Sequence, residues 1–140
     1  MRLLEMGAED YLISSCLLGL MAQRLVRVLC PYCRIPSHPE SQVLEEMGVD
    51  PNERLKVEVY EAKGCEKCAQ TGYRGRTGIY ELIPVNDRIK NLILKKADAS
   101  ALRRKAVEDG MRTLRQDGWE KVKNGITSVA EVLRVTLEER

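Results

Sequence analysis

The chain has 140 residues, of which 44% are hydrophobic and 31% charged, with 23 basic and 21 acidic side chains and a net charge of +2. This apolar content and low net charge exclude a disordered chain. The near balance of charges argues against nucleic acid or anionic lipid as a partner, so we expect protein partners. Aromatic residues make up 4% and phenylalanine is absent, which favours a mostly α-helical core of aliphatic side chains.

The N-terminal residues do not form a secretory signal, because they include Glu5, Glu9 and Asp10. The longest uncharged stretch, residues 11–23, is shorter than the roughly 20 residues that cross a bilayer. We therefore expect a cytoplasmic protein with no membrane span.

Residues 11–29 are predicted to form one buried helix, because apolar side chains recur there at helical spacing. Pro31 follows directly and cannot continue a helix. A short helix is expected at residues 41–47, within a polar stretch rich in glycine and proline.

Two strands are predicted in the middle of the chain. Apolar and charged residues alternate over residues 56–61, with Leu55 preceding them on the apolar face, and residues 77–83 are rich in β-forming side chains. We expect these two strands to pair with each other.

Four short helices are predicted after Pro84. They cover residues 87–96, a segment from Asp98 to Gly110, residues 113–124 and residues 129–137. Asn86 and Asp98 are suitable N-caps, and Gly125 suits the left-handed position after a helix. Ser128 and Glu131 have the spacing of a capping box. The sequence thus predicts an α+β fold that is mostly α-helical.

Four cysteines form two Cys-x-x-Cys pairs, Cys30 with Cys33 and Cys65 with Cys68. Each pair can turn two thiolates toward one point, and two pairs make a tetrahedral set for zinc. Because four thiolates leave no coordination position for water or substrate, the predicted zinc is structural and not catalytic. Residues 34–64, between the pairs, are then an insertion that bears no ligand.

A redox dithiol and disulfides are the alternative interpretations of these cysteines. A cytoplasmic location disfavours disulfides, and no thioredoxin-like βαβ pattern surrounds either pair. Zinc is therefore the preferred interpretation.

Other residues near the pairs are candidate ligands or neighbouring charges. Cys16 has no paired neighbour and is expected to be a small buried hydrophobe. His38 could replace a ligand, although four cysteines already complete the set. A zinc tetrathiolate has a formal charge of −2, which nearby cations could balance unless they are simply solvated. The nearby cations are Arg34, Lys63, Lys67 and Arg74.

Three stretches carry a resemblance to a known family. The sequence AQRLVR (22–27) leads into the first cysteine pair, and GCEKCAQTGYRGRTGIYEL (64–82) contains the second. DGMRTLRQDG (109–118) is followed by GITS (125–128) and VLRVT (132–136). In this order they resemble the C-terminal part of the type II secretion and type IV pilus assembly ATPases, over nearly the whole chain.

The resemblance implies a hexameric ATPase ring, peripheral at the cytoplasmic face of the bacterial inner membrane, that powers protein secretion or pilus assembly. It implies ring neighbours and inner-membrane platform proteins as partners, and ATP with magnesium as cofactors of the parent protein. The phosphate-binding loop of that family ends in Gly-Lys followed by Ser or Thr, and the present sequence contains no Gly-Lys pair. We therefore expect no ATP hydrolysis by this chain alone.

The resemblance also implies three parts. Residues 1–29 would be the tail of a RecA-like motor core, residues 30–81 a metal-binding subdomain and residues 82–140 a helical subdomain. Side chains that could lie near the nucleotide in an intact ring are Gln23, Arg24 and Arg76, with solvated surface residues as the alternative.

Rival functions remain for a chain of this kind. A zinc ribbon that binds nucleic acid would need a basic face with interleaved aromatic residues, and basic and acidic residues alternate here. An Hsp40-like zinc motif would need repeated glycines, and the first pair is followed by Arg34-Ile-Pro. A free-standing zinc-ribbon interaction module is the remaining alternative, and it would expose apolar area on residues 11–29.

Overall fold

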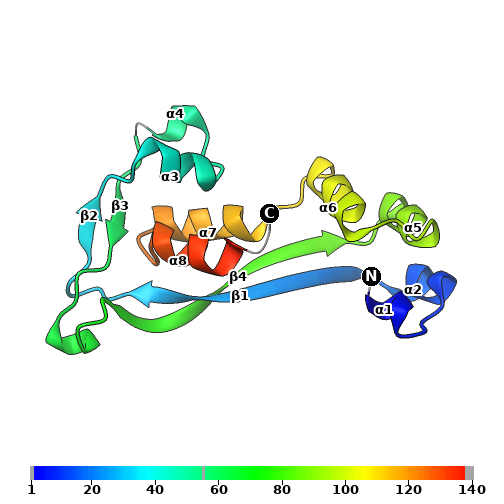
Figure 1. The fold of residues 1–140 in the computed structure, drawn as a ribbon, viewed down its shortest axis with the longest axis horizontal. Coiled ribbons are helices and arrows are strands. Elements are labelled where there is room, and N and C mark those ends of the chain that lie inside the picture. Colours follow the sequence, from blue (N-terminus) through cyan, green and yellow to red (C-terminus); the bar gives the residue numbers. More distant parts are fainter. Residues whose placement is uncertain (1, 55, 138–140) are drawn as a thin grey trace. The chain divides into compact units, whose positions relative to one another are not determined.

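The computed structural model describes residues 2–54 and 56–137, which form short helices and two-stranded sheets, the α+β fold that the sequence predicts (Figure 1). In chain order the elements are α1 (Arg2–Glu5), α2 (Asp10–Cys16), β1 (Gly19–Leu29), β2 (Ile35–Ser37), α3 (Ser41–Glu46), α4 (Pro51–Arg54), β3 (Val59–Glu61), the 3-10 helix η1 (Glu66–Cys68), β4 (Tyr73–Pro84), α5 (Asp87–Leu94), α6 (Ala99–Glu108), α7 (Leu114–Lys123) and α8 (Val129–Thr136).

The predicted single helix over residues 11–29 is wrong. Helix α2 ends at Cys16, and residues 19–29 form β1, which pairs with β4. The apolar residues of β1 fit a helical spacing, but Val26 and Val28 also suit an extended chain that packs against a neighbouring strand. Strand pairing with β4 decided the outcome.

The predicted pairing of the two middle strands is also wrong. Strand β3 is shorter than expected and pairs antiparallel with β2, in a register that sets Ile35 opposite Glu61 and Ser37 opposite Val59. Pro36 faces Tyr60 at the position between these pairs, where a residue without an N–H breaks no ladder hydrogen bond. Leu55, expected beside β3, lies outside the described residues.

The C-terminal helices agree with the prediction. The side chain of Asn86 accepts a hydrogen bond from the backbone N–H of Ile89 at the start of α5, and Asp98 does the same for Ala101 at the start of α6. Gly125 has φ +69°, the left-handed conformation expected after a helix. The short helix predicted at residues 41–47 is α3.

The capping box at α8 is only half present. Ser128 accepts a hydrogen bond from the backbone N–H of Glu131, as expected of an N-cap. The Glu131 carboxylate, however, accepts hydrogen bonds from Arg27 and Arg134. Two guanidinium groups outcompeted the single backbone donor that a capping box would supply.

The chain divides into two compact units, Met1–Ala22 with Glu81–Thr113, and Gln23–Tyr80 with Leu114–Arg140. The predicted boundaries after residues 29 and 81 stay predictions. The first unit packs α2, α5 and α6 around an apolar core. The buried members of that core are Ile89, Ile93, Leu102, Ala106 and Met111.

The second unit has its own core, in which α7 and α8 pack against each other. Its fully buried side chains include Val26, Val59, Val122 and Val132, and Trp119 on α7 is 6% exposed. Gly118 allows the close approach of the two helices, because a Cβ atom there would lie 2.5 Å from Cγ1 of Val132.

Among the described residues, no helix has the length and apolar character that a membrane span requires.

Candidate metal centre

The structure brings the two Cys-x-x-Cys pairs together in the second unit. Cys30 directly follows β1. Cys65 directly precedes the short helix η1, and Cys68 is its last residue. The four sulfur atoms all lie within 4.8 Å of one another. Sulfur–sulfur distances are 3.9 Å between Cys30 and Cys65, 3.9 Å between Cys33 and Cys68, and 3.7 Å between Cys65 and Cys68.

These distances fit a tetrahedral metal site. Zinc–sulfur bonds of ~2.3 Å at tetrahedral angles place neighbouring sulfurs ~3.8 Å apart. The measured separations agree with that value, and four soft sulfur donors are the set that structural zinc prefers. The cluster can therefore hold a metal ion without moving its backbone.

Backbone donors surround the Cys68 sulfur. The N–H groups of Cys65 and Gly72 each donate a hydrogen bond to it at 3.2 Å. Burial opposes ionisation of Cys68, but these two backbone donors outweigh it and lower its pKa to about 6. Burial raises the pKa of Cys33 to about 11. The two backbone donors thus favour the thiolate form of Cys68, which is the form that binds a metal.

Gly72 fixes the start of β4 against the first cysteine pair. Its carbonyl oxygen accepts a hydrogen bond from the N–H of Cys30 at 2.9 Å. It has φ +79°, and a Cβ atom there would lie 2.5 Å from the Cβ of Ala62. An amino acid with a Cβ atom would be strained by this backbone conformation and would also clash with Ala62. Glycine is therefore required at position 72.

Residues 34–64 leave the site after the first pair and return to it at the second, and they contain β2, α3, α4 and β3. The first end of this segment is held at the cluster by the turn after Cys30, where the N–H groups of Cys33 and Arg34 both donate to the Cys30 carbonyl oxygen. The insertion predicted between the pairs is therefore a folded excursion.

The other candidate ligands stay outside the cluster. His38 is not part of the group of metal-binding side chains that the described residues form, and it lines a separate pocket with Pro39 and Arg54. Cys16 is exposed, which corrects the prediction of a buried hydrophobe. The correction follows from the fold, because α2 ends at Cys16 and does not continue as a buried helix.

Two of the flanking cations make specific contacts. Arg34 donates a hydrogen bond from Nη1 to the carbonyl oxygen of Gly125 at 2.6 Å, and its guanidinium lies 4.3 Å from the ring centroid of Tyr60. This contact ties the first cysteine pair to the turn that follows α7. Lys67 lies 3.8 Å from the ring centroid of Tyr32, so each pair contributes one partner to a cation–π contact.

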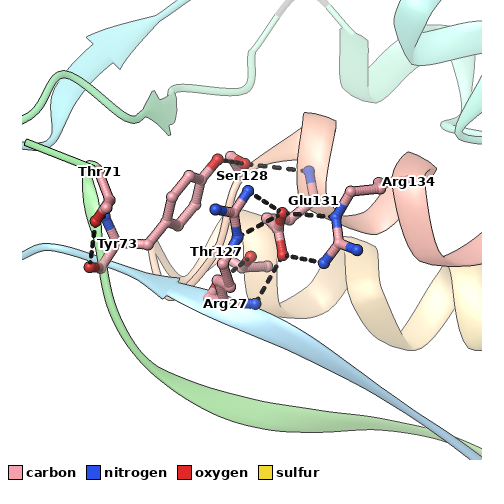
Figure 2. A network of polar contacts seen from close by, with 7 residues as sticks. All are labelled: Arg27, Thr71, Tyr73, Thr127, Ser128, Glu131 and Arg134. Carbon is pink, nitrogen blue, oxygen red and sulfur yellow. Dashed lines mark hydrogen bonds and ion pairs between the residues drawn. The ribbon is translucent and has the colours of Figure 1, made fainter.

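A buried ionic network, which sequence reasoning missed, connects β1 to α8 (Figure 2). Glu131 is 1% exposed, and its carboxylate accepts hydrogen bonds from the backbone N–H and side chain of Arg27 and from the side chain of Arg134. Burial opposes its ionisation, but the hydrogen bonds from Arg134 and Arg27 prevail and lower the pKa of Glu131 to about 2. The capping-box spacing hid this role, because a glutamate at that position is also explained by the helix start.

Tyr73 on β4 completes this network. Its ring lies 4.2 Å from the Arg27 guanidinium, and its hydroxyl shares a 2.7 Å hydrogen bond with Ser128 (Figure 2). Thr127 donates a hydrogen bond to the carbonyl oxygen of Arg27 at 2.7 Å. The strand that leads into the metal centre is therefore fixed to the start of α8.

The predicted nucleotide-adjacent residues are exposed on the two strands. Gln23 and Arg24 lie on β1, where Nη1 of Arg24 donates to the carbonyl oxygen of Gln23 at 3.0 Å, and Arg76 lies on β4. Their proximity to nucleotide stays a prediction.

Comparison with known proteins finds relatives over nearly the whole chain. A sequence model of the type II/IV secretion system protein family matches residues 1–134. The type II secretion system protein E of Pseudomonas aeruginosa is 46% identical over 99% of this chain and 27% of its own length. The type II secretion system ATPase E of Vibrio cholerae is 45% identical over 98% of this chain and 27% of its own length.

The type IV pilus assembly ATPase PilB of Thermus thermophilus is 41% identical over 98% of this chain and 15% of its own length. The chain thus spans between 15% and 27% of these relatives. Because the match extends over nearly all of its residues, this chain belongs to the type II/IV secretion system protein family.

Proposed function

We propose that this chain is the C-terminal, zinc-binding part of a hexameric cytoplasmic ATPase, peripheral at the bacterial inner membrane, that powers type II secretion or type IV pilus assembly. The observation that carries the proposal is the tetrahedral spacing of four cysteine sulfurs in a chain of this family. The names of the relatives support both the secretion and the pilus systems.

The zinc has a structural role in this proposal. It would join the end of β1 to η1 and the start of β4, with Cys30, Cys33, Cys65 and Cys68 as its ligands. A zinc ion bound by four thiolates stabilises the fold by cross-linking distant segments, and it activates no water. Its loss would release both ends of the excursion at residues 34–64.

The chain alone would not hydrolyse ATP, because it has no Gly-Lys pair with which to form a phosphate-binding loop. ATP and magnesium would bind elsewhere in the parent protein. In the parent, residues 1–29 would belong to the motor core, residues 30–81 to the metal-binding subdomain and residues 82–140 to a helical subdomain. The last two would serve ring assembly and docking of inner-membrane partners.

Metal analysis tests the zinc. The purified chain should contain about one zinc ion, and a chelator should expose four thiols in addition to Cys16. Cys16→Ser is the matched control, because Cys16 is exposed and lies outside the cluster, so its zinc content should not change. Cys65→Ser should lose the metal. A metal-free chain with Cys65 oxidised or free would overturn the zinc assignment.

The nucleotide contact of Arg76 has a separate test in the full-length parent. Arg76→Ala should lower the ATPase rate of the assembled ring if this guanidinium reaches phosphate across a subunit boundary. Arg74→Ala is the control, because Arg74 is also an exposed arginine on the same strand. Equal rates in wild type and in Arg76→Ala would exclude the contact while leaving the zinc assignment intact.

A further inference from the structure

A groove in the second unit lies between β3 and the first turns of α8. It has a volume of about 400 Å³. One side is formed by Ser37, Pro39 and Val43 together with the consecutive residues Val59–Ala62, and the other by Ser128, Val129, Ala130 and Leu133. Tyr73, which is bonded to Ser128 in Figure 2, closes part of the groove.

The backbone of β3 has one unpaired edge. In the antiparallel ladder with β2, Ile35 and Ser37 exchange hydrogen bonds with Glu61 and Val59, so Tyr60 directs its N–H and C=O away from β2. Neither group has a hydrogen-bond partner within residues 2–54 and 56–137. An unpaired strand edge of this kind is a template for a further strand.

The side chains around the groove define what fits there. The half-buried residues Pro39, Val43 and Leu133 supply apolar surface, and Glu61 is the single charged residue that lines the groove. Glu61 is exposed, and its carboxylate accepts one hydrogen bond, from the hydroxyl of Ser37 at 3.0 Å. An occupant with aliphatic side chains and one basic side chain would complement both features.

We propose that this groove binds an extended peptide segment of a partner protein, which adds as a strand to the free edge of β3 and places a lysine or arginine beside Glu61. The three residues of β3 and the following Ala62 together extend ~13 Å, which accommodates a partner strand of about four residues. Main-chain hydrogen bonds to Tyr60 supply affinity, and the apolar surface with Glu61 supplies specificity.

This inference rests on the docking role proposed above and specifies which surface would dock a partner. Its test does not involve ATP, secretion or the metal content, so the two proposals can fail separately. The probe is a set of end-blocked, fluorescent hexapeptides of alternating valine and isoleucine, with either lysine or glutamate at one central position. Binding to the zinc-loaded 140-residue chain is measured by fluorescence anisotropy.

Lysine peptides should bind at least tenfold more tightly than their glutamate counterparts. Glu61→Lys should reverse that preference, whereas Glu58→Lys, a change at an exposed residue outside the lining set, should leave it unchanged. Methylation of the peptide nitrogen that faces Tyr60 should weaken binding at least tenfold. Ala130→Arg, which fills the groove from α8, should abolish binding, and circular dichroism verifies that each variant is folded.

Two results would overturn the proposal. The first is no binding of any lysine peptide up to millimolar concentration. The second is binding that Glu61→Lys and Ala130→Arg both leave unchanged. Concentration-dependent self-association that the same two substitutions abolish would assign the groove to a second copy of this chain, and would overturn the partner-peptide assignment as well.

Discussion

Arg27 and Glu131 are 104 residues apart in the chain, yet three hydrogen bonds join them. The backbone N–H of Arg27 donates to Oε2 of Glu131 at 2.8 Å, while Nε and Nη2 donate to Oε1 at 2.9 and 2.7 Å. Because main chain and side chain both take part, the carboxylate fixes the position of β1 on α8, as well as balancing a charge.

Removal of this carboxylate should destabilise the second unit. Glu131→Gln leaves the guanidinium groups of Arg27 and Arg134 without their counter-charge, and we expect a loss of about 2–3 kcal/mol in the free energy of unfolding. Both arginines are about half exposed, which limits the loss because water can solvate them. Urea unfolding followed by circular dichroism measures it.

The control is Glu120→Gln on α7. Glu120 forms an exposed ion pair with Lys123, and such pairs contribute below about 1 kcal/mol. Equal losses of unfolding free energy in the two variants would show that the network around Glu131 contributes no more to stability than the ion pair of Glu120 with Lys123.

The same network predicts acid sensitivity. The pKa of Glu131 is lowered from its ordinary value of 4.5 to about 2. A carboxylate with a lowered pKa in the folded state contributes its full stability above the unfolded pKa, and that contribution disappears as the pH falls from 4.5 to about 2. Unfolding free energies of wild type and Glu131→Gln should therefore converge across this range. A constant difference would contradict the prediction.

Helix packing predicts an unusual effect at Gly118. Alanine normally stabilises a helix interior by about 1 kcal/mol relative to glycine. Here the added Cβ atom would meet Cγ1 of Val132 at 2.5 Å and Cγ2 at 2.9 Å. We expect Gly118→Ala to lower the free energy of unfolding by roughly 1–3 kcal/mol, because the packed helices must move apart.

A second substitution separates packing from helix propensity. A Val132→Ala background removes the contacts at 2.5 and 2.9 Å and keeps only the Cβ of residue 132, at 3.3 Å. Gly118→Ala should then become nearly neutral, with a coupling of about 1–3 kcal/mol between the two sites. Additive effects in this double-mutant cycle, measured by urea unfolding, would exclude the packing explanation.

Gly72 should be required for metal affinity. Gly72→Ala strains a backbone with φ +79°, forces a 2.5 Å contact with Ala62 and disturbs the N–H donor to the Cys68 sulfur. Loss of such an outer donor weakens metal binding by about 10- to 100-fold. Competition with a chromophoric zinc chelator measures the change.

Gly75→Ala isolates the contribution of the site. Gly75 has nearly the same backbone conformation, with φ +82°, and no atom lies within 4 Å of an added Cβ. Gly75→Ala introduces the conformational strain without a steric contact, so its zinc affinity should stay close to that of wild type. Similar losses in both variants would mean that backbone strain on β4, and not the sulfur contact, controls the metal.

The sequence predicted well what depends on local chemistry. The caps at Asn86 and Asp98 formed as expected, because a cap needs only a side chain and a backbone donor three residues away. The cysteine spacing predicted a common site because each pair closes its own turn. The Gly125 position after α7 also followed from a local rule, since glycine adopts positive φ without strain.

The rest depended on distant parts of the chain. The apolar residues of β1 satisfy a helical spacing, and only the presence of β4 beside them made the extended form favourable. Strand β2 has three residues and contains Pro36, so it has no recognisable strand pattern of its own. The Arg27–Glu131 contact could not be predicted, because nothing in either local sequence specifies a partner 104 residues away.

Trp119 gives the molecule a selective optical reporter. It is the one tryptophan of the sequence, it is 6% exposed on α7, and its indole nitrogen donates a 3.4 Å hydrogen bond to Glu53 on α4. All of these contacts belong to the second unit. Tryptophan emission will therefore follow the melting of the metal-bearing unit alone, while the ellipticity of the chain follows both, so a single sample reveals whether the two units unfold together.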